Sequence, residues 1–476
     1  MQGRKDIQPK MMYQVTLDSL VAKDNFYRRL NSELNLSFLY KETARYYGSE
    51  GQDSIDPVVF FKICLVGYLN NITSDRKLIE TCANRLDIRL YIKYDIDETL
   101  PWHSTISRTR QLYGEEVFLS LFRKVLSMCV QKGMVRGKRQ AVDSVFVKAN
   151  ASMDSLVERQ INEDVAVYAE ELDKGSEYKL TVRKEDDKPE GDIKDVNANN
   201  KTHYSPTDPD AKISKKGGRP CQLNYYGQIV VDDANHVITA AAADFADRKD
   251  SQCVENIVGQ TIENFKLNDL SLDQLLADTN YSSGEALRYL EAYGIDGYIP
   301  SHALYKPSKE GFIYNDILDR YECTKGNMAV LPYKETIPSS NGLSKKTYRS
   351  STECTTCPLK QTCLGKTRYK QLTHTTDKPY YDRMHKKMQT PYGRKTARLR
   401  GSTVEPVLGT LVNFLGMKKV NSKGIKQANK HVLLASVCYN LKKYLKFTTK
   451  RMKSMVMAMT GSTEANWSTQ LAYMSY

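Results

Sequence analysis

The chain has 476 residues, 40% of them hydrophobic, and its formal net charge is +14 at pH 7. This length suffices for two or three domains with sizeable cores. No apolar run of about 18 residues or more occurs, and the first residues lack the apolar region of a signal peptide, so we expect neither a membrane span nor secretion. Most of the ten cysteines stand singly in apolar surroundings, which predicts a reduced, cytoplasmic protein rather than a disulfide scaffold.

The positive charge is concentrated toward the C-terminus. From Lys366 onward the chain has 22 Lys and Arg residues against four acidic ones, a net charge of +18, whereas the remainder is close to −4. A one-sided basic segment favours a polyanionic partner. The alternative is a lysine-rich surface that only keeps the protein soluble.

Residues 1–135 predict an all-α domain. Pro57–Tyr68 is almost wholly apolar and is expected to form the central helix of a bundle, and Ser74–Leu86 repeats its apolar residues at helical spacing. Between Ser74–Leu86 and a third helix at 115–133 lies a short basic helix, which is expected to begin near Ser104 or Thr105. Its predicted role is to display Arg108 and Arg110 as in a helix-turn-helix DNA reader, although a domain that only packs is an equal alternative.

From residue 136 the pattern alternates between strands and helices. A strand at 141–147 is followed by a hairpin at 228–242, a helix at 250–265, a strand at 274–277, a helix at 282–293, a strand at 297–300 and a helix at 403–417. This order fits an RNase H-like domain with a mixed five-stranded sheet, so the fold class expected is α+β and multidomain. The expected divisions are a first core part at 136–301, C-terminal core helices at 401–447 and a basic tail at 448–476.

Two insertions are expected to interrupt this core. The first, at 152–222, is charge-rich, and we expect a helical piece followed by a mobile or DNA-contacting loop that includes Thr207–Lys212. The second, at 302–400, carries Cys354-x2-Cys357-x5-Cys363, with Cys323 upstream. Four thiolates are a suitable ligand set for one structural Zn²⁺. Reduced thiols on a loop are the alternative.

Three acidic residues stand in settings that suit metal-dependent chemistry. Asp143 lies within an apolar strand, Asp278 follows another strand, and Glu405 lies at an expected helix start. Carboxylates from such elements can hold two Mg²⁺ ions against a phosphate. Each also has a simpler interpretation. Asp143 is then a solvent-facing side chain, Asp278 a turn or helix-capping aspartate, and Glu405 part of a capping box that begins at Ser402.

The position of Pro406 bears on the last of these alternatives. If Thr403 is the N-cap, Pro406 falls in the first turn, where proline is tolerated, and Glu405 is free to face a metal. Basic residues on both sides of Glu405 are expected to contact the DNA backbone: Arg398, Arg400, Lys418 and Lys419.

Several separated blocks resemble bacterial insertion-sequence DDE transposases of the IS-eleven-eighty-two group, relatives of the IS-four and IS-five groups. The resemblance spans about residues 17–445. The blocks are Pro-Trp-His-Ser-Thr-Ile-Ser-Arg, Val-Asp-Ser-Val-Phe-Val-Lys-Ala-Asn, Thr-Asp-Pro-Asp-Ala, Asn-Tyr-Tyr-Gly-Gln-Ile-Val-Val-Asp, Ala-Asp-Thr-Asn-Tyr-Ser, Cys-Thr-Thr-Cys-Pro-Leu, Thr-Val-Glu-Pro-Val-Leu-Gly and Asn-Leu-Lys-Lys-Tyr-Leu. Related groups place a lysine about seven residues after the catalytic glutamate, whereas this chain has Val412 there.

The resemblance implies a DDE triad formed by Asp143, Asp278 and Glu405. It also implies two Mg²⁺ or Mn²⁺ ions, binding to terminal inverted repeats and target DNA, DNA cleavage followed by strand transfer, a homo-oligomeric synaptic complex, and a nucleoid-associated location in a bacterial cytoplasm. Two alternatives stay open. One is a nuclease of the same fold that does not join strands, and the other is a decayed transposase that only binds DNA.

Overall fold

The computed structural model describes residues 14–48, 50, 54–158, 198–215, 218, 220–302, 305–338, 344–350 and 352–473, with side chains described as far as residue 449. The basic side chains expected at 450–476 and the helical piece expected within 159–197 lie outside the described residues. In the described part of the chain, no helix is long and apolar enough to cross a membrane.

The N-terminal region is helical, as expected. Its central helix α4 is buried along most of its length, and Asp56 caps it by accepting hydrogen bonds from the N–H groups of Val58 and Val59. The elements are α1 (Leu17–Leu20), α2 (Phe26–Glu33), α3 (Phe38–Thr43), η1 (Ala44–Tyr46), α4 (Pro57–Leu69), α5 (Asp75–Asn84), α6 (Leu86–Ile92), α7 (His103–Leu112) and α8 (Glu115–Gln131).

A mixed sheet follows. Strand β1 pairs in antiparallel fashion with β5 and in parallel with β7, and β7 pairs in parallel with β8, while β6 lies antiparallel to β5. These are the five strands expected, and a sixth, β4, pairs with the start of β5. The strands are β1 (Arg139–Lys148), β4 (Lys212–Ser214), β5 (Gln222–Asp232), β6 (Ile238–Phe245), β7 (Gln274–Leu276) and β8 (Asp296–Tyr298).

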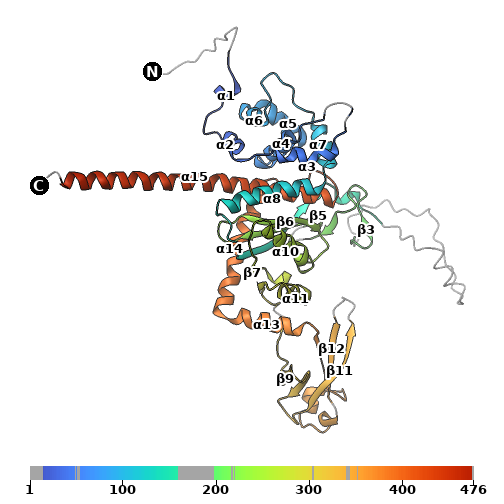
Figure 1. Ribbon diagram of the computed structural model, residues 1–476. Helices are drawn as coiled ribbons and strands as arrows, with labels where there is room; N and C mark the ends of the chain where they lie inside the picture. Colours follow the sequence, from blue (N-terminus) through green and yellow to red (C-terminus); the bar gives the residue numbers. More distant parts are fainter. Residues whose placement is uncertain are drawn as a thin grey trace, which may run out of the picture.

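Helices cover this sheet, and one of them links it to the N-terminal region. Helix α15 contacts β5 and β6 as well as α8, α4 and α2, and it lies with α8 between the N-terminal helices and the sheet (Figure 1). Buried residues of the N-terminal helices and of the sheet belong to one continuous hydrophobic core. The other elements of this part are η2 (Met153–Ser155), β2 (Val157–Glu158), β3 (His203–Tyr204), α10 (Asp250–Lys266), η3 (Thr279–Tyr281), α11 (Gly284–Ala292), α13 (Lys378–Gln389), α14 (Pro391–Phe414) and α15 (Ile425–Tyr473).

Two expectations about local structure are wrong. The segment at Thr207–Lys212 is held in place rather than mobile, because Asp208 accepts a hydrogen bond from the N–H of Gly424 and Asp210 accepts one from the N–H of Ile425, each at 3.0 Å. Buried Tyr225 donates to the same oxygen of Asp208 at 2.5 Å. These residues therefore fix the first turn of α15, where unpaired N–H groups need acceptors. Contact of this segment with DNA stays a prediction.

The second error concerns the helix that carries Glu405. Helix α14 begins at Pro391 with Thr390 as its N-cap, so Pro406 lies inside the helix rather than in its first turn. Thr403 does not cap a helix, since its hydroxyl donates to the carbonyl of Leu399 at 2.8 Å, one turn earlier in the same helix.

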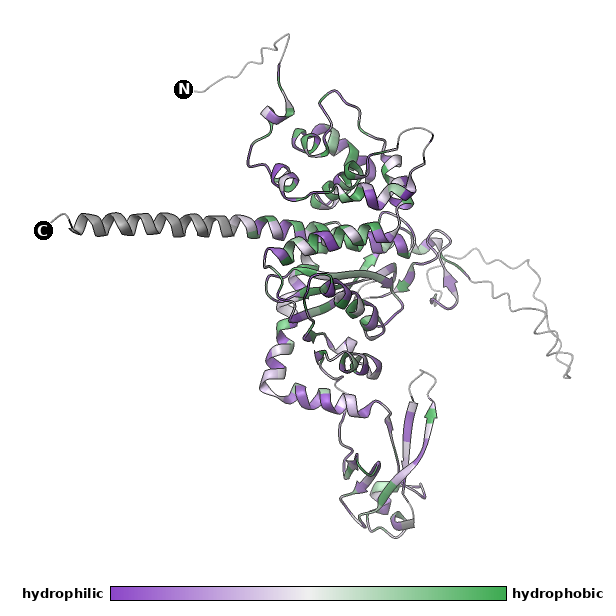
Figure 2. Cartoon of the chain, in the orientation of Figure 1, coloured by the Kyte–Doolittle hydropathy of each residue, from purple (hydrophilic) through white to green (hydrophobic). Residues whose placement is uncertain are grey.

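The second insertion contains a five-stranded antiparallel sheet with a separate small core. Four buried residues, Phe312, Tyr321, Leu331 and Tyr348, form that core. The unit and helix α13 are more hydrophilic than the region where α4, α8 and α15 meet (Figure 2). The sheet has the order β13-β12-β11-β10-β9; its elements are β9 (Phe312–Asn315), β10 (Arg320–Cys323), β11 (Val330–Pro338), β12 (Ser344–Arg349), η4 (Thr352–Cys354), α12 (Lys360–Leu364) and β13 (Gln371–Thr375).

Candidate active site

Two of the three acidic residues occupy equivalent positions relative to two neighbouring parallel strands, Asp143 within β1 and Asp278 just after the end of β7. Ala141 of β1 is paired with Leu276 of β7. Asp143 lies two residues after Ala141, and Asp278 lies two residues after Leu276. Because side chains alternate between the two faces of a sheet with a period of two, Asp143 and Asp278 are in register with each other and lie on the same face. Asp278 also caps the short helix η3 through the N–H of Asn280, so the capping interpretation of this residue is compatible with a place in the site.

Arg400 connects the third acidic residue to the first. One terminal guanidinium nitrogen of Arg400 lies 2.7 Å from Oδ2 of Asp143, and the other lies 3.1 Å from Oε1 of Glu405. The side chains of Arg400 and Asp143 are 18% and 17% exposed, whereas that of Glu405 is 62% exposed. The connection follows from the packing of α14 against β1. Asp143 is thus the inner carboxylate and Glu405 the outer one.

The electrostatics of Asp143 and Asp278 show that they share an acidic environment. Burial raises the pKa of Asp143 above its ordinary value, and Arg400 counteracts this shift. Burial also raises the pKa of Asp278, and the negative charges of Asp250 and Asp143 raise it further. Both carboxylates therefore lie in a setting that favours a bound cation.

Sequence reasoning missed Asp250, which lies in the first turn of α10. This aspartate is buried and accepts hydrogen bonds from Ser144 at 2.6 Å, from Tyr226 at 2.8 Å and from Gln228 at 3.4 Å. Ser144 follows Asp143 directly in β1, so Asp250 holds the strand beside the first acidic residue. The sequence signal for a role of Asp250 in the site was weak. An aspartate in the first turn of a helix is common because its negative charge is favourable near the positive end of the helix dipole.

The basic residues expected to contact DNA have different surroundings. Arg108, Arg398, Lys418 and Lys419 are exposed, and Lys418 and Lys419 lie beside the end of β1, where the carbonyl of Lys418 accepts from the N–H of Lys148. Arg110 is buried and forms two hydrogen bonds with Asp75, at 2.8 and 3.0 Å. The prediction that α7 displays Arg110 is therefore wrong.

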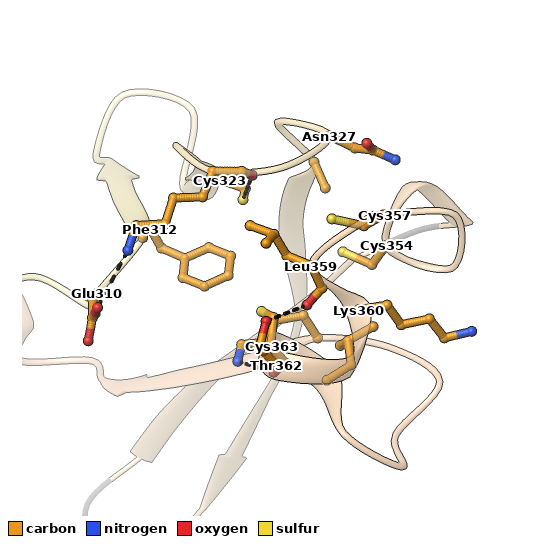
Figure 3. A pocket seen from close by; sticks show the side chains of 15 residues that line it. Glu310, Phe312, Cys323, Asn327, Cys354, Cys357, Leu359, Lys360, Thr362 and Cys363 are labelled. Carbon is orange, nitrogen blue, oxygen red and sulfur yellow. Dashed lines mark hydrogen bonds and ion pairs between the residues drawn. The ribbon is translucent and has the colours of Figure 1, made fainter.

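The four cysteines of the second insertion line one cavity of about 530 Å³ (Figure 3). Cys323 ends β10, Cys354 ends η4, Cys357 follows η4 and Cys363 lies in α12. Cys354 also belongs to a second small cluster with Ala329 and Leu364, against which Cys323 packs. Despite this grouping, no set of three or more His, Cys, Asp or Glu side chains among the described residues is arranged to hold a metal ion.

The acidic site nevertheless offers the right donors for a hard cation. Asp143, Asp278 and Glu405 present carboxylate oxygens, which Mg²⁺ and Mn²⁺ prefer to nitrogen or sulfur. The guanidinium of Arg400 lies between Asp143 and Glu405. These carboxylates are therefore suitable ligands for Mg²⁺ or Mn²⁺. The positive group that hydrogen-bonds to Asp143 and Glu405 in this structure is the guanidinium of Arg400.

Comparison with known protein families gives two matches. Residues 15–112 match a family described as Transposase domain (DUF772), and residues 322–445 match a family described as Transposase DDE domain. The first covers α1 to α7, and the second includes Glu405 and Arg400 but neither Asp143 nor Asp278. A search of curated proteins found no match.

Proposed function

Because this chain belongs to the DDE transposases of insertion sequences, we propose that it binds the terminal inverted repeats of a mobile element and cleaves and joins DNA with two divalent metal ions. The register that aligns Asp143 with Asp278 carries this proposal, together with the contact of Arg400 with both Asp143 and Glu405. The strand order, with three antiparallel strands followed by two parallel ones, supports an RNase H-like catalytic domain. Membership of the IS-eleven-eighty-two group remains a prediction.

In the proposed mechanism each acidic residue has a distinct task. Asp143 of β1 and Asp278, just after β7, would hold the metal ions together with Glu405 of α14. When bound, Mg²⁺ or Mn²⁺ would neutralise charge at the scissile phosphate and activate a water or a 3′-hydroxyl group. Asp250 fixes the strand segment that carries Asp143 through Ser144. Exposed Arg398 contacts the DNA backbone next to the site.

The N-terminal helices are proposed to bind the element end. Helix α7 presents exposed Arg108, and the residue before the helix, Trp102, is 76% exposed. Tryptophan is rarely so open to solvent unless a partner covers it. Assembly of several copies into a synaptic complex is part of the same proposal.

A structural Zn²⁺ bound by Cys323, Cys354, Cys357 and Cys363 is proposed for the second insertion. The four side chains line one cavity, and because they are not grouped closely enough to hold a metal as they stand, zinc binding would draw them together. The core of the unit is very small. Units with so few buried residues commonly depend on a metal or a disulfide for stability. Gly326, with φ +63°, leaves room beside Cys357, because a Cβ at this position would lie 2.5 Å from its sulfur.

The proposed chemistry is tested with Asp143→Asn, which removes one anionic ligand and keeps the side-chain shape. A labelled duplex that carries the element end is incubated with Mg²⁺, and both nicked and joined products are measured. We expect both to fall on the order of a thousand-fold or more, with DNA affinity within about threefold of the parent. Asp154→Asn, which alters an exposed aspartate outside the site, is the control and should cleave normally.

Other outcomes separate the alternatives. Nicks without joined products in the parent protein would indicate a nuclease that does not transfer strands. DNA binding with no cleavage by the parent in either Mg²⁺ or Mn²⁺ would indicate a decayed transposase. Full strand transfer by Asp143→Asn would refute the assignment of the triad.

A further inference from the structure

The site contains a cation where the proposed function requires metal ions. The guanidinium of Arg400 donates to Oδ2 of Asp143 at 2.7 Å and to Oε1 of Glu405 at 3.1 Å, through two different nitrogens. Two of the three proposed metal ligands are therefore held by a single arginine. The arginine reaches them from the helix that carries Glu405, five residues before it.

Without a counter-ion this group of acids would be unfavourable. The negative charge of Asp143 acts on Asp278, and that of buried Asp250 acts on both. Like charges that are partly removed from water repel one another, and a nearby guanidinium offsets part of that repulsion. Arg400 therefore stabilises the metal-free site.

The same oxygens cannot bond fully to both Arg400 and a metal ion. Metal binding must accordingly replace at least part of the ion pair, and the neighbourhood permits the change. Glu405 is mostly exposed and can turn. Gly401 has no side chain to limit this movement, since a Cβ there would lie 3.2 Å from Oε1 of Glu405.

We propose that Arg400 is an exchangeable counter-ion: it neutralises Asp143 and Glu405 before metal binding, and it passes to a DNA phosphate when metal ions take its place. The inference rests on the proposed function and concerns the regulation of that site. A displaced Arg400 remains tethered to α14 beside Glu405, so its charge stays at the place where DNA must bind. Guanidinium groups pair well with phosphate oxygens.

The exchange makes metal binding and DNA binding cooperative. Metal ions release Arg400 for DNA, and a phosphate that binds Arg400 releases the carboxylates for metal. By thermodynamic linkage, each ligand raises the affinity for the other by the same factor. The coupling is expected to be about tenfold, the scale of one partly buried ion pair.

Arg400→Gln tests the exchange through metal affinity instead of activity. Mn²⁺ binding to the full-length protein without DNA is measured by electron paramagnetic resonance. The variant should bind Mn²⁺ about tenfold more tightly than the parent, because the carboxylates no longer have a competitor. It should also unfold at a lower temperature in EDTA and gain more than the parent from added Mn²⁺. Arg400→Lys, which keeps the charge but cannot bridge both carboxylates in the same way, should bind Mn²⁺ with intermediate affinity.

Arg398→Gln is the matched control. It removes the same charge from the same helix, two residues away, but the described hydrogen bonds and ion pairs do not connect Arg398 to either carboxylate. Its Mn²⁺ affinity should change less than twofold. An equal gain in the two variants would show a general charge effect and would overturn the exchange.

The failure of this inference can be distinguished from the failure of the proposed function. If Asp143→Asn abolishes Mn²⁺ binding while folded Arg400→Gln and Arg400→Lys bind it no more tightly than the parent, only the counter-ion exchange is refuted. If Asp143→Asn leaves Mn²⁺ binding intact, these carboxylates are not the metal site and both proposals fall. Adding the element-end duplex should tighten Mn²⁺ binding by the parent but not by Arg400→Gln, and equal tightening would also refute the exchange.

Discussion

Residues of the same type have opposite roles in this chain because their surroundings differ. Arg108 and Arg110 are two positions apart on α7, and side chains with that spacing point in different directions around a helix. Arg108 is exposed, and its hydrogen bonds within the described part of the chain go to Ser104 of its own helix, whereas Arg110 is buried against Asp75 of α5. The basic pattern in the sequence could not separate these cases, because the partner of Arg110 lies 35 residues away.

Arg110→Ala should therefore lower stability rather than DNA affinity. Its loss leaves Asp75 without its partner in a largely buried setting, which typically costs about 3 kcal/mol. The unfolding free energy is measured by urea titration, with Arg108→Ala as the control that should change it by less than about 0.5 kcal/mol. If Arg110→Ala kept full stability but bound the element end weakly, its interpretation as a structural ion pair would be wrong.

At the scale of elements, the sequence predicted the types of helices and strands better than their limits. The apolar runs of α4 and β1 gave clear signals because both elements are largely buried, and the turn between β5 and β6 was recognisable from its Asp and Asn residues. The start of α14 was missed because its first turns are polar and Arg-rich and because Pro406 indicates a helix start in most contexts. The cap from Asp208 and Asp210 depends on a contact across more than 200 residues, which local patterns cannot reveal.

The small sheet β9–β13 should depend on metal if its four cysteines bind zinc. Purified protein is then expected to contain about one equivalent of Zn²⁺, and Cys357→Ser should lose most of it, since three thiolates hold the ion less tightly than four. Metal content is measured by elemental analysis after dialysis. Cys221→Ser, which alters an exposed cysteine outside the cluster, should keep its zinc. Parent protein without zinc and with all four thiols reactive would contradict the prediction.

At the scale of the whole molecule, the N-terminal helices and the sheet share one hydrophobic core, with α8 and α15 between them. The sequence predicted a helical region followed by a mixed sheet, and this broad division is confirmed by the structure. It did not predict that α15 would join them, because the helix has apolar residues on more than one side and so gives no clear amphipathic pattern. Exposed basic residues occur both on α7 and beside the acidic site.

DNA binding should accordingly depend strongly on salt. Each phosphate contact adds roughly 0.9 to the slope of log affinity against log salt concentration. Replacing Lys418 and Lys419 together by glutamine should reduce the size of that slope by roughly 2, whatever the DNA sequence. Fluorescence anisotropy at several salt concentrations gives the slope. Lys201→Gln, an exposed lysine outside the expected contact set, should leave it unchanged.

The place of α15 in the core has a consequence for the timing of activity during protein synthesis. Its residues Val432 to Leu445 pack against elements made much earlier, including α4, α8 and β6. While the ribosome is still making this segment, those elements lack their apolar cover and the core cannot close. Asp143 is synthesised long before Glu405, and α15 follows both. The core, and with it the proposed acidic site, is therefore expected to become complete only after α15 has been synthesised.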